Sequence, residues 1–394
     1  MHNNVKISHT KFPLILTLNI IFILRMSGIF MALPILPVYA KSLQGSCEYL
    51  IGISIGIYGI TQIIFQLPFG LISDKIGRKP IVIIGLIISV IGNELIAIAH
   101  EIWSLIIGRA LQGLSAIGSV LIALLLESIQ EKHHMQAMAI VGISFGITFI
   151  GSIIAGPFIA NKFGFHGLFH IITIITILTI LLVHFTIPTT HSCIDKNINL
   201  FKIFNDIKLI ITHSELLKLN FHIFCLHTVL ILNFLIWPKI ITNLGYLYNV
   251  HYKIYAAVIL TSIFISFPCI FLSHIKKHRK KMLIIAVNIL FLSELIMFIT
   301  IHNFWLFLFS MQLFFVSFNL IESILPYLIN KTSPTQYKGT SISIYSIGQF
   351  LGVGLGGIVG GFLLEIQDIW LVFLFILLLT AINILINTKL QQPY

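Results

Sequence analysis

The chain has 394 residues, of which 57% are hydrophobic and only 9% are charged, and its mean hydropathy is +1.02. A soluble domain of this length could not hide so many apolar side chains, so the composition indicates a membrane protein. The formal net charge of +11 would suggest nucleic-acid binding in a soluble chain. Here the basic residues fall in short loops between apolar runs, so topology explains them better and we expect no nucleic-acid partner.

Apolar runs separated by polar or turn-forming residues predict an all-α membrane protein, because each helical span needs about 20 apolar residues. The longest polar break predicts a cytoplasmic linker at 188–216, between an N-terminal six-helix bundle (1–187) and a C-terminal six-helix bundle (217–394). The twelve predicted spans are 13–40, 48–72, 80–100, 103–127, 136–160, 166–187, 217–242, 251–273, 282–301, 304–330, 339–363 and 369–388.

Lysine and arginine in the loops predict the orientation of the chain. If the N-terminus is cytoplasmic, 18 of the 24 basic residues lie in inside loops, four lie outside, and Arg25 and Arg109 lie within spans. Cytoplasmic loops carry an excess of Lys and Arg, so this asymmetry predicts that both termini are cytoplasmic and that the protein lies in the cell inner membrane.

The two halves share weak internal similarity. The segment "NELIAIAHEIW" at Asn93–Trp103 is similar to "SELIMFITIHNFW" at Ser293–Trp305, and the loops after the second and eighth spans are both basic. Two six-helix repeats in the same orientation build a large class of transporters, whose substrate site lies between the halves. The predicted chemistry is therefore movement by alternating access, with no catalytic residues.

The loop "GLISDKIGRKP" (70–80) gathers charge between the second and third spans. Its basic residues follow from a cytoplasmic location alone, but Asp74 and two glycines at fixed spacing do not. Gly70 has no side chain and would let another helix approach closely. Gly77 can adopt a backbone conformation closed to other residues, which allows a tight turn.

This loop fits the pattern G-x-x-x-D-[RK]-x-G-[RK]-[RK] and resembles the signature loop of the major facilitator superfamily. "GRALQG" (108–113) is similar to the R-x-x-Q-G motif of that family, and "AGP" (155–157), with Gly156 and Pro157, to the helix-packing G-P motif of its proton-driven antiporters. Segments 25–36, 57–80, 322–329 and 337–357 resemble the YajR type of bacterial drug–proton antiporter. Two departures are Ser152 and Ala160 in place of glycines, and an end at Tyr394 where that type continues into a soluble domain.

The resemblance implies a conformational latch on the cytoplasmic side. Asp74 would lie at the positive N-terminal end of the eleventh span, and Arg78 would pair with Glu127. A closed latch would favour the outward-open state and would break when the halves rock. The predicted latch residues are Gly70, Asp74, Gly77, Arg78, Lys79 and Glu127.

Charged residues inside spans are the second signal, because a lone charge at mid-bilayer costs several kcal/mol and usually faces a cavity or a partner. Glu94 and Arg109 lie at similar depth and could form a structural pair, and the same interpretation holds for Glu294. Glu322 is the leading candidate for a proton carrier, with Arg25 as the cation that modulates it. A static hydrogen bond between helices is the alternative role for Glu322.

The polar residues inside or beside spans are candidate substrate contacts: Tyr39, Gln62, Gln66, Gln112, Asn233 and Gln349. The histidines are scattered without the spacing of a metal site, so we expect no metal and no cofactor. Three functions remain open: proton-coupled efflux of small lipophilic molecules, transport of a small metabolite by the same fold, and a non-transporting membrane sensor. The expected partners are a small-molecule substrate, protons and the lipid bilayer, and we expect a monomer.

Overall fold

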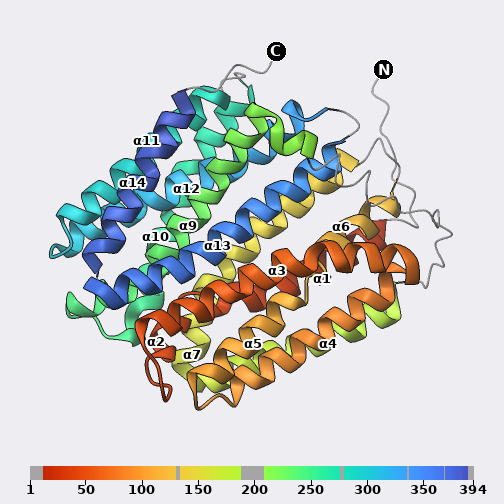
Figure 1. Cartoon of the computed structure of the whole chain (residues 1–394), viewed down its shortest axis with the longest axis horizontal. Helices are drawn as coiled ribbons and strands as arrows, with labels where there is room; N and C mark the ends of the chain where they lie inside the picture. The colour runs from red at the N-terminus through yellow and green to blue at the C-terminus, as the bar shows by residue number, and fades with distance from the viewer. Residues whose placement is uncertain are drawn as a thin grey trace. The chain divides into compact units, whose positions relative to one another are not determined.

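The computed structural model describes residues 12–129, 134–187, 208–275, 279–334, 337–367 and 369–388. Within these residues every regular element is an α-helix (Figure 1). Most of the predicted linker 188–216 lies outside the described residues. The helices are α1 (Phe12–Ala32), α2 (Leu36–Ala40), α3 (Glu48–Ile76), α4 (Arg78–Ala97), α5 (Ile102–Leu114), α6 (Gly118–Glu127), α7 (His134–Thr186), α9 (Ser214–Asn243), α10 (Tyr248–Ile275), α11 (Arg279–Ile299), α12 (Phe304–Thr332), α13 (Lys338–Gln367) and α14 (Ile369–Thr388).

The helix lengths agree with the predicted fold class. In the described part of the chain, 10 helical segments are long and apolar enough to cross a membrane, and a shorter apolar helix covers Leu16–Ala32. One of the 10, Ile140–Thr186, is 47 residues long and is interrupted at Gly164, where φ is 74°. This segment accounts for the fifth and sixth spans, so the prediction of twelve helices in the major facilitator arrangement is confirmed.

Two predicted spans are broken helices rather than continuous ones. The first span divides into α1 and α2 around Pro34, because proline lacks a backbone N–H and disfavours helical geometry in the residue before it. The fourth span divides into α5 and α6 at Ser115–Ile117, where the N–H of Ala116 donates to the carbonyl of Leu114. Such a break leaves a carbonyl that must be satisfied elsewhere, since no water is available within the bilayer.

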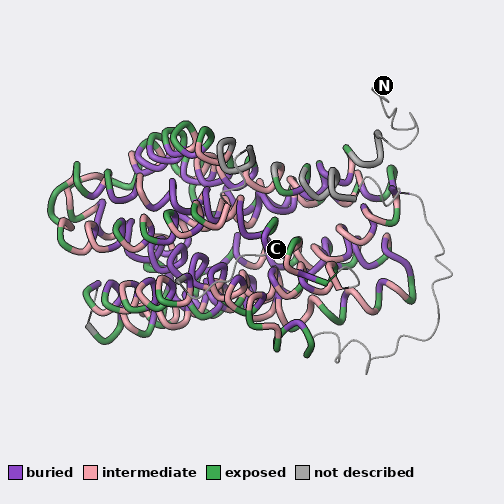
Figure 2. The backbone as a smooth tube through the Cα atoms, turned by 90° about the horizontal axis from the view of Figure 1, so that it is seen from above, coloured by how far each residue is buried: buried purple, intermediate pink, exposed green. Residues whose placement is uncertain are grey.

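Internal contacts divide the chain into two compact units. The first unit comprises Met1–Tyr39 and Thr61–Lys196, and the second comprises Ala40–Ile60 and Asn197–Tyr394. Helix α3 therefore contributes its first part to the second unit and its second part to the first. Buried and exposed stretches alternate along the helices (Figure 2), as expected for helices with one face in a protein core and one face outside it.

In the first unit, α7 packs against α1 and α4, and α4 packs against α5. The core contains Ile21, Val82, Leu86 and Val120, none of which is exposed. Gly156 on α7 lies against the backbone of α1, where a Cβ would overlap Met31. The close approach expected for the helix-packing residue Gly156 is therefore present, and Pro157 lies inside the same helix.

In the second unit, α9 is the central helix. In its 18-residue apolar stretch 83% of the residues are buried, compared with 33% in the corresponding stretch of α10. Helix α13 packs along α9 through glycines at every fourth position, Gly352, Gly356 and Gly360, each of which would bring a Cβ into close contact with α9. Small residues permit this tight helix packing in a membrane, where lipid provides no hydrophobic drive for association.

Candidate functional site

The charged loop lies at the junction of α3 and α4. Gly77 precedes the first residue of α4 and has φ 100° and ψ 152°, a backbone conformation that residues with a side chain rarely adopt. The backbone conformation expected at Gly77 is therefore present. The turn places Arg78 at the start of α4, where its side chain is 9% exposed and reaches residues of both α3 and α6.

Arg78 joins two carboxylates in the first unit. Its Nη2 donates to Glu127 Oε1 at 2.7 Å and its Nε donates to the same oxygen at 3.1 Å. Its Nη1 contacts Asp74 Oδ1 and Ser73 Oγ, both at 2.5 Å. The pairing of Arg78 with Glu127 expected from the sequence is present. Charge-assisted hydrogen bonds of this kind are stronger than neutral ones and have a defined geometry.

The other latch residues differ in their surroundings. Lys79 donates from Nζ to the carbonyl of His184 at 2.7 Å, which ties the start of α4 to the end of α7. A Cβ built at Gly70 would meet no described atom within 4 Å. The close helix approach expected at Gly70 is therefore absent within its own unit. The position of Asp74 relative to the eleventh span stays a prediction.

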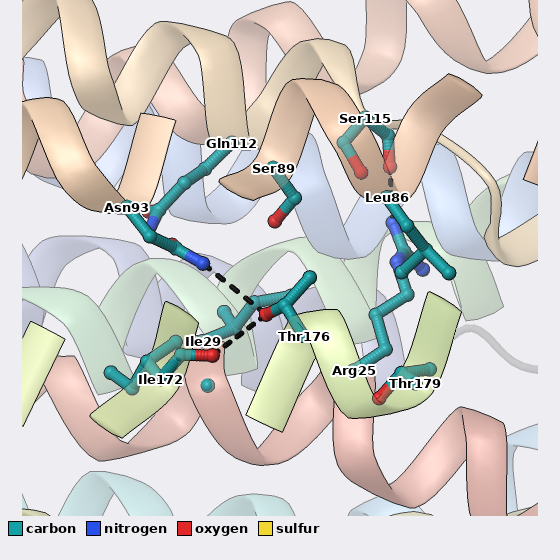
Figure 3. A pocket seen from close by; sticks show the side chains of 11 residues that line it. Arg25, Ile29, Leu86, Ser89, Asn93, Gln112, Ser115, Ile172, Thr176 and Thr179 are labelled. Carbon is teal, nitrogen blue, oxygen red and sulfur yellow. Dashed lines mark hydrogen bonds between the residues drawn. The ribbon is translucent and has the colours of Figure 1, made fainter. Parts of the chain in front are cut away.

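A chain of polar side chains crosses the interior of the first unit. Arg109 Nη1 donates to Gln112 Oε1 at 2.7 Å, and Gln112 Nε2 donates to Asn93 Oδ1 at 2.5 Å. Asn93 Nδ2 in turn donates to Thr176 Oγ1 at 3.3 Å, as Figure 3 shows. These side chains connect α5, α4 and α7. Gln112, Asn93 and Thr176, together with Arg25, line a small, water-sized cavity.

Arg25 is bound at the break between α5 and α6. Its Nη2 donates to the carbonyl of Ser115 at 2.6 Å (Figure 3). Ser115 lies outside both helices, and its carbonyl also accepts from the N–H of Ile117 at 2.9 Å. The guanidinium of the first span therefore adds a second hydrogen bond to a carbonyl at the interruption of the fourth span, and such contacts stabilise non-helical backbone at membrane depth.

The expected pair between Glu94 and Arg109 is not formed. Glu94 instead contacts His170 Nδ1 at 3.2 Å, and its side chain is 39% exposed. The pair is absent because of the direction of the Glu94 side chain, since successive residues of a helix point about 100° apart around its axis. Asn93 occupies the inward face of α4 and is 1% exposed, so its neighbour Glu94 is directed away from the interior that contains Arg109.

The substrate-contact candidates of the first unit have different environments. Tyr39 donates from its hydroxyl to the carbonyl of Ala99 at 3.2 Å, and its ring is stacked on Phe165. Gln62 is 2% exposed, and its Oε1, like that of Gln66, has no hydrogen-bond partner among the described residues. The two glutamines are one helical turn apart on α3, so they present adjacent polar groups.

In the second unit, Glu294 and Asn233 form a buried pair. Neither is exposed, and Asn233 Nδ2 donates to Glu294 Oε1 at 2.8 Å. The pair joins α9 to α11 and places Asn233 inside the unit. Its side-chain amide therefore serves the carboxyl group of Glu294, in agreement with the structural interpretation of Glu294.

Glu322 lies at the centre of a second polar cluster, formed by α9, α12 and α13. Gln349 Nε2 donates to Glu322 Oε1 at 3.0 Å, and the hydroxyl of Tyr345 donates to the same oxygen at 3.5 Å. Gln349 Nε2 also lies 3.5 Å from Nε2 of His227. Glu322 Oε2 is buried and has no hydrogen-bond partner in the described part of the chain.

Sequence reasoning missed two members of this cluster, Tyr345 and His227. Tyr345 is one helical turn before Gln349, so the spacing of four residues on one helix face is the signal that could have found it. No sequence signal indicated His227, because it is on another helix of the unit, 95 residues before Glu322. Among the described residues, no group of His, Cys, Asp and Glu is arranged to hold a metal ion.

Comparison with known proteins agrees with this architecture. The model of the Major Facilitator Superfamily matches residues 18–275 and 223–391. The chain belongs to the major facilitator superfamily. It is 40% identical to the inner membrane transport protein YajR of Escherichia coli (strain K12) over 378 residues. This match covers 95% of this chain and 83% of that protein.

Two further proteins are similar to this chain, one in sequence and one in fold. A class B tetracycline resistance protein of Escherichia coli is 29% identical over 160 residues, which is 40% of this chain and 38% of that protein. The crystal structure of a D-xylose–proton symporter superposes with a TM-score of 0.77 at 15% identity, covering 97% of this chain and 98% of that one. The symporter shows the fold alone. The chain is thus a multi-pass membrane transporter and not an enzyme.

Proposed function

We propose that this transporter carries small lipophilic or drug-like molecules out of the cell in exchange for protons. The polar cluster around Glu322 supports the proposal most directly. A carboxyl group with one oxygen hydrogen-bonded and the other buried without a partner among the described residues can bind and release a proton without disturbing the helices that hold it. The name of one relative, a tetracycline resistance protein, favours efflux.

Glu322 is the proposed proton carrier, and Arg25 the cation that modulates its proton affinity. The amide of Gln349 and the hydroxyl of Tyr345 orient the carboxyl group from α13. In the proposed cycle, a proton from outside binds Glu322, the halves rock, and the proton is released to the cytoplasm as substrate leaves. Gln62 and Gln66 are proposed substrate contacts, because their buried amide oxygens have no hydrogen-bond partner in the described part of the chain.

The cluster of Arg78 with Asp74 and Glu127 is the proposed latch of this cycle. The contact of Arg78 on α4 with Asp74 on α3 must break if these two helices change their relative position, and the bonds of Arg78 to Glu127 on α6 hold the guanidinium in place, so the cluster opposes such a change. The proposed orientation places this loop and both termini on the cytoplasmic side of the inner membrane. The proposed functional unit is the monomer.

Transport in proteoliposomes tests the exchange. With purified protein, an internal pH dye and an acidic interior, external tetracycline or ethidium is expected to raise the internal pH, because entry of each molecule releases protons. D-xylose and a nucleoside serve as comparison compounds. Acidification of the interior on substrate addition, without an imposed gradient, would instead indicate symport and would contradict the proposal.

The matched controls are two substitutions of the same type. Glu322→Gln is expected to remove the pH response but to retain substrate binding. Binding is measured as the thermal stabilisation of the protein by the substrate. Glu294→Gln replaces another buried carboxyl group of the same unit and is expected to retain the response. If both variants retain it, Glu322 is not the proton carrier.

A further inference from the structure

The side-chain amide of Gln349 contacts two groups that can each bind a proton. Its Nε2 lies 3.0 Å from Oε1 of Glu322 on α12 and 3.5 Å from Nε2 of His227 on α9. His227 is 7% exposed. One nitrogen atom on α13 is therefore the link between a carboxyl group and an imidazole ring on two other helices.

The hydrogen bonds define which nitrogen of His227 carries hydrogen. Nδ1 lies 3.2 Å from the carbonyl oxygen of Ile223, an acceptor only, so Nδ1 carries the hydrogen in this arrangement. In the neutral ring Nε2 is then an acceptor. The two hydrogens of the Gln349 amide nitrogen are thus given to two acceptors, one to Glu322 and one to His227.

Other titratable and charged groups of the surrounding helices are not part of the hydrogen-bonded set of Glu322, Gln349 and His227. Among the described residues, Gln349 and the Tyr345 hydroxyl of α13 are the groups that hydrogen-bond to Glu322, and there no charged side chain of α10, α11 or α14 is hydrogen-bonded or ion-paired to Glu322 or His227. Three other buried titratable side chains of these helices bond elsewhere: His222 of α9 to Asn383 of α14, His251 of α10 to the carbonyl of Tyr246, and Glu294 of α11 to Asn233 of α9. Cys225 of α9 and Tyr255 of α10 are also buried, and the Tyr255 hydroxyl has no hydrogen-bond partner among the described residues.

Protonation of His227 is incompatible with the observed orientation of the amide. A hydrogen on Nε2 of His227 would face the N–H of Gln349, and both groups would be donors. The amide must then rotate by half a turn, so that its oxygen accepts from His227. The same rotation turns that oxygen towards Oε1 of Glu322, which is also an acceptor unless it carries a proton.

We propose that Gln349 acts as an amide switch that orders the binding of two protons. Glu322 binds the first proton, the Gln349 amide rotates, and His227 binds the second. The only bonds formed are the O–H of Glu322 and the N–H of His227, and both protons come from water and return to it. This inference rests on the proposed role of Glu322 as a proton carrier and extends it to a site for two protons.

Charge attraction alone predicts a different behaviour. A carboxylate favours a nearby imidazolium, so His227 would be protonated while Glu322 is ionised. That ion pair needs the amide to present its oxygen to one group and its nitrogen to the other. The structure instead presents the same nitrogen to both. The two explanations therefore make opposite predictions for a variant in which residue 322 is permanently neutral.

Nuclear magnetic resonance of ¹⁵N-histidine-labelled protein in detergent decides between them, with His227→Asn identifying the His227 signal. In Glu322→Gln the new amide can donate to the rotated Gln349 oxygen, as a protonated carboxyl group would. The fraction of His227 that is protonated at a fixed, mildly acidic pH is expected to rise several-fold above wild type. A fall or no change would overturn the amide switch.

A second comparison guards against a purely structural effect. Gln349→Leu removes the link, so Glu322→Gln in that background leaves only the lost charge and is expected to lower the protonated fraction of His227. Gln312→Leu removes another glutamine of the same unit, which bonds to Thr261, and is expected to retain the rise. A rise in the Gln349→Leu background would overturn the proposal.

Infrared spectroscopy separates failure of this inference from failure of the proposed function. The C=O band that disappears in Glu322→Gln reports the protonated carboxyl group. Glu322→Gln is expected to raise the protonated fraction of His227 when Gln349 is present and to lower it in the Gln349→Leu background. If the band changes with pH but this change of sign is not seen, the amide switch is wrong and Glu322 remains the proposed proton carrier. If the band never changes while the protein stays folded, both are wrong.

Discussion

The interiors of the two units contain opposite kinds of charge. The first unit buries the guanidinium groups of Arg25 and Arg109, which donate to a backbone carbonyl and to Gln112. The second unit places the carboxyl groups of Glu294 and Glu322 inside, each with one bonded oxygen and an Oε2 that has no partner among the described residues. A guanidinium keeps its charge at every accessible pH, whereas a carboxyl group can gain and lose a proton.

This difference makes the two units suitable for different tasks. The first unit has a network whose charge state is constant, so it is suited to positioning. The second unit has the groups whose charge can change, so it is suited to coupling substrate transport to the binding and release of protons. The paired segments at Glu94 and Glu294 show the divergence: one side chain is 39% exposed beside His170, and the other is fully buried beside Asn233.

The strongest test of the comparison is Glu322→Gln. Glutamine retains the size of the side chain and an oxygen for Gln349, but it cannot carry a proton. Accumulation driven by a pH gradient in proteoliposomes is expected to fall to the level of protein-free liposomes, while exchange of labelled for unlabelled substrate continues. Accumulation at the wild-type level would show that the second unit is not the coupling unit.

Packing differs between the units as well, and Gly156→Ala tests the tighter contact in the first. A Cβ at this position would overlap the backbone of Met31, which cannot move as a side chain can. Overpacking of this kind is expected to cost about 2 kcal/mol of unfolding free energy, measured as a lower thermal transition in detergent. The control is Gly151→Ala on the same helix, where a Cβ meets nothing within 4 Å.

Gly151→Ala is expected to be neutral or to stabilise the helix by about 0.5 kcal/mol, because alanine has the higher helix propensity. Equal losses in both variants would show that the loss at position 156 reflects helix propensity or detergent effects and not the contact between α1 and α7.

The charged loop of the first unit supplies a third test, Arg78→Gln. The substitution leaves Asp74 and Glu127 without their shared cation. Both carboxylates are partly exposed, with side-chain exposures of 29% and 39%, so solvent screens part of the effect. We expect a loss of about 1 kcal/mol in unfolding free energy and a shift in the balance of inward- and outward-open states.

Distances between spin labels on the two halves would measure that balance, and Lys75→Gln is the control. Lys75 is exposed and belongs to the same loop, so its loss changes the net charge without changing the cluster. A shift of the same size in both variants would reduce the proposed latch to a simple effect of loop charge.

Much of the fold could be predicted from the sequence, because hydrophobic length is a one-dimensional signal. The spans follow from runs of apolar residues, and the turn at Gly77 follows from the position of a glycine in the charged loop. The pair of Arg78 with Glu127 was implied by the resemblance of this loop to the signature of the family. The breaks at Pro34 and Ser115 were not predicted, since an apolar run looks continuous even where the backbone is interrupted.

The candidate site was harder to predict, because side-chain direction depends on rotation about each helix axis. Depth along the membrane placed Glu94 and Arg109 at the same level, but the two side chains point in different directions. His227 contacts Gln349 across 122 positions of sequence. Only the packing of α9 on α13, through its glycines, brings these two residues together.

The last comparison concerns the carboxyl groups of the two similar sequence segments, Glu94 and Glu294, and the smaller effect is expected at Glu94. Glu94→Gln removes a partly exposed contact with His170 and is expected to change unfolding free energy by less than about 0.5 kcal/mol. Glu294→Gln keeps an oxygen for Asn233 and gains an amide that can donate to the Oδ1 of Asn233, which has no partner among the described residues. We expect this variant to be stabilised by about 1 kcal/mol, measured as a higher thermal transition, with unchanged pH-driven transport. Destabilisation together with uncoupling would make Glu294 a second proton-binding group, and the coupling function of the second unit would then be shared between two carboxyl groups.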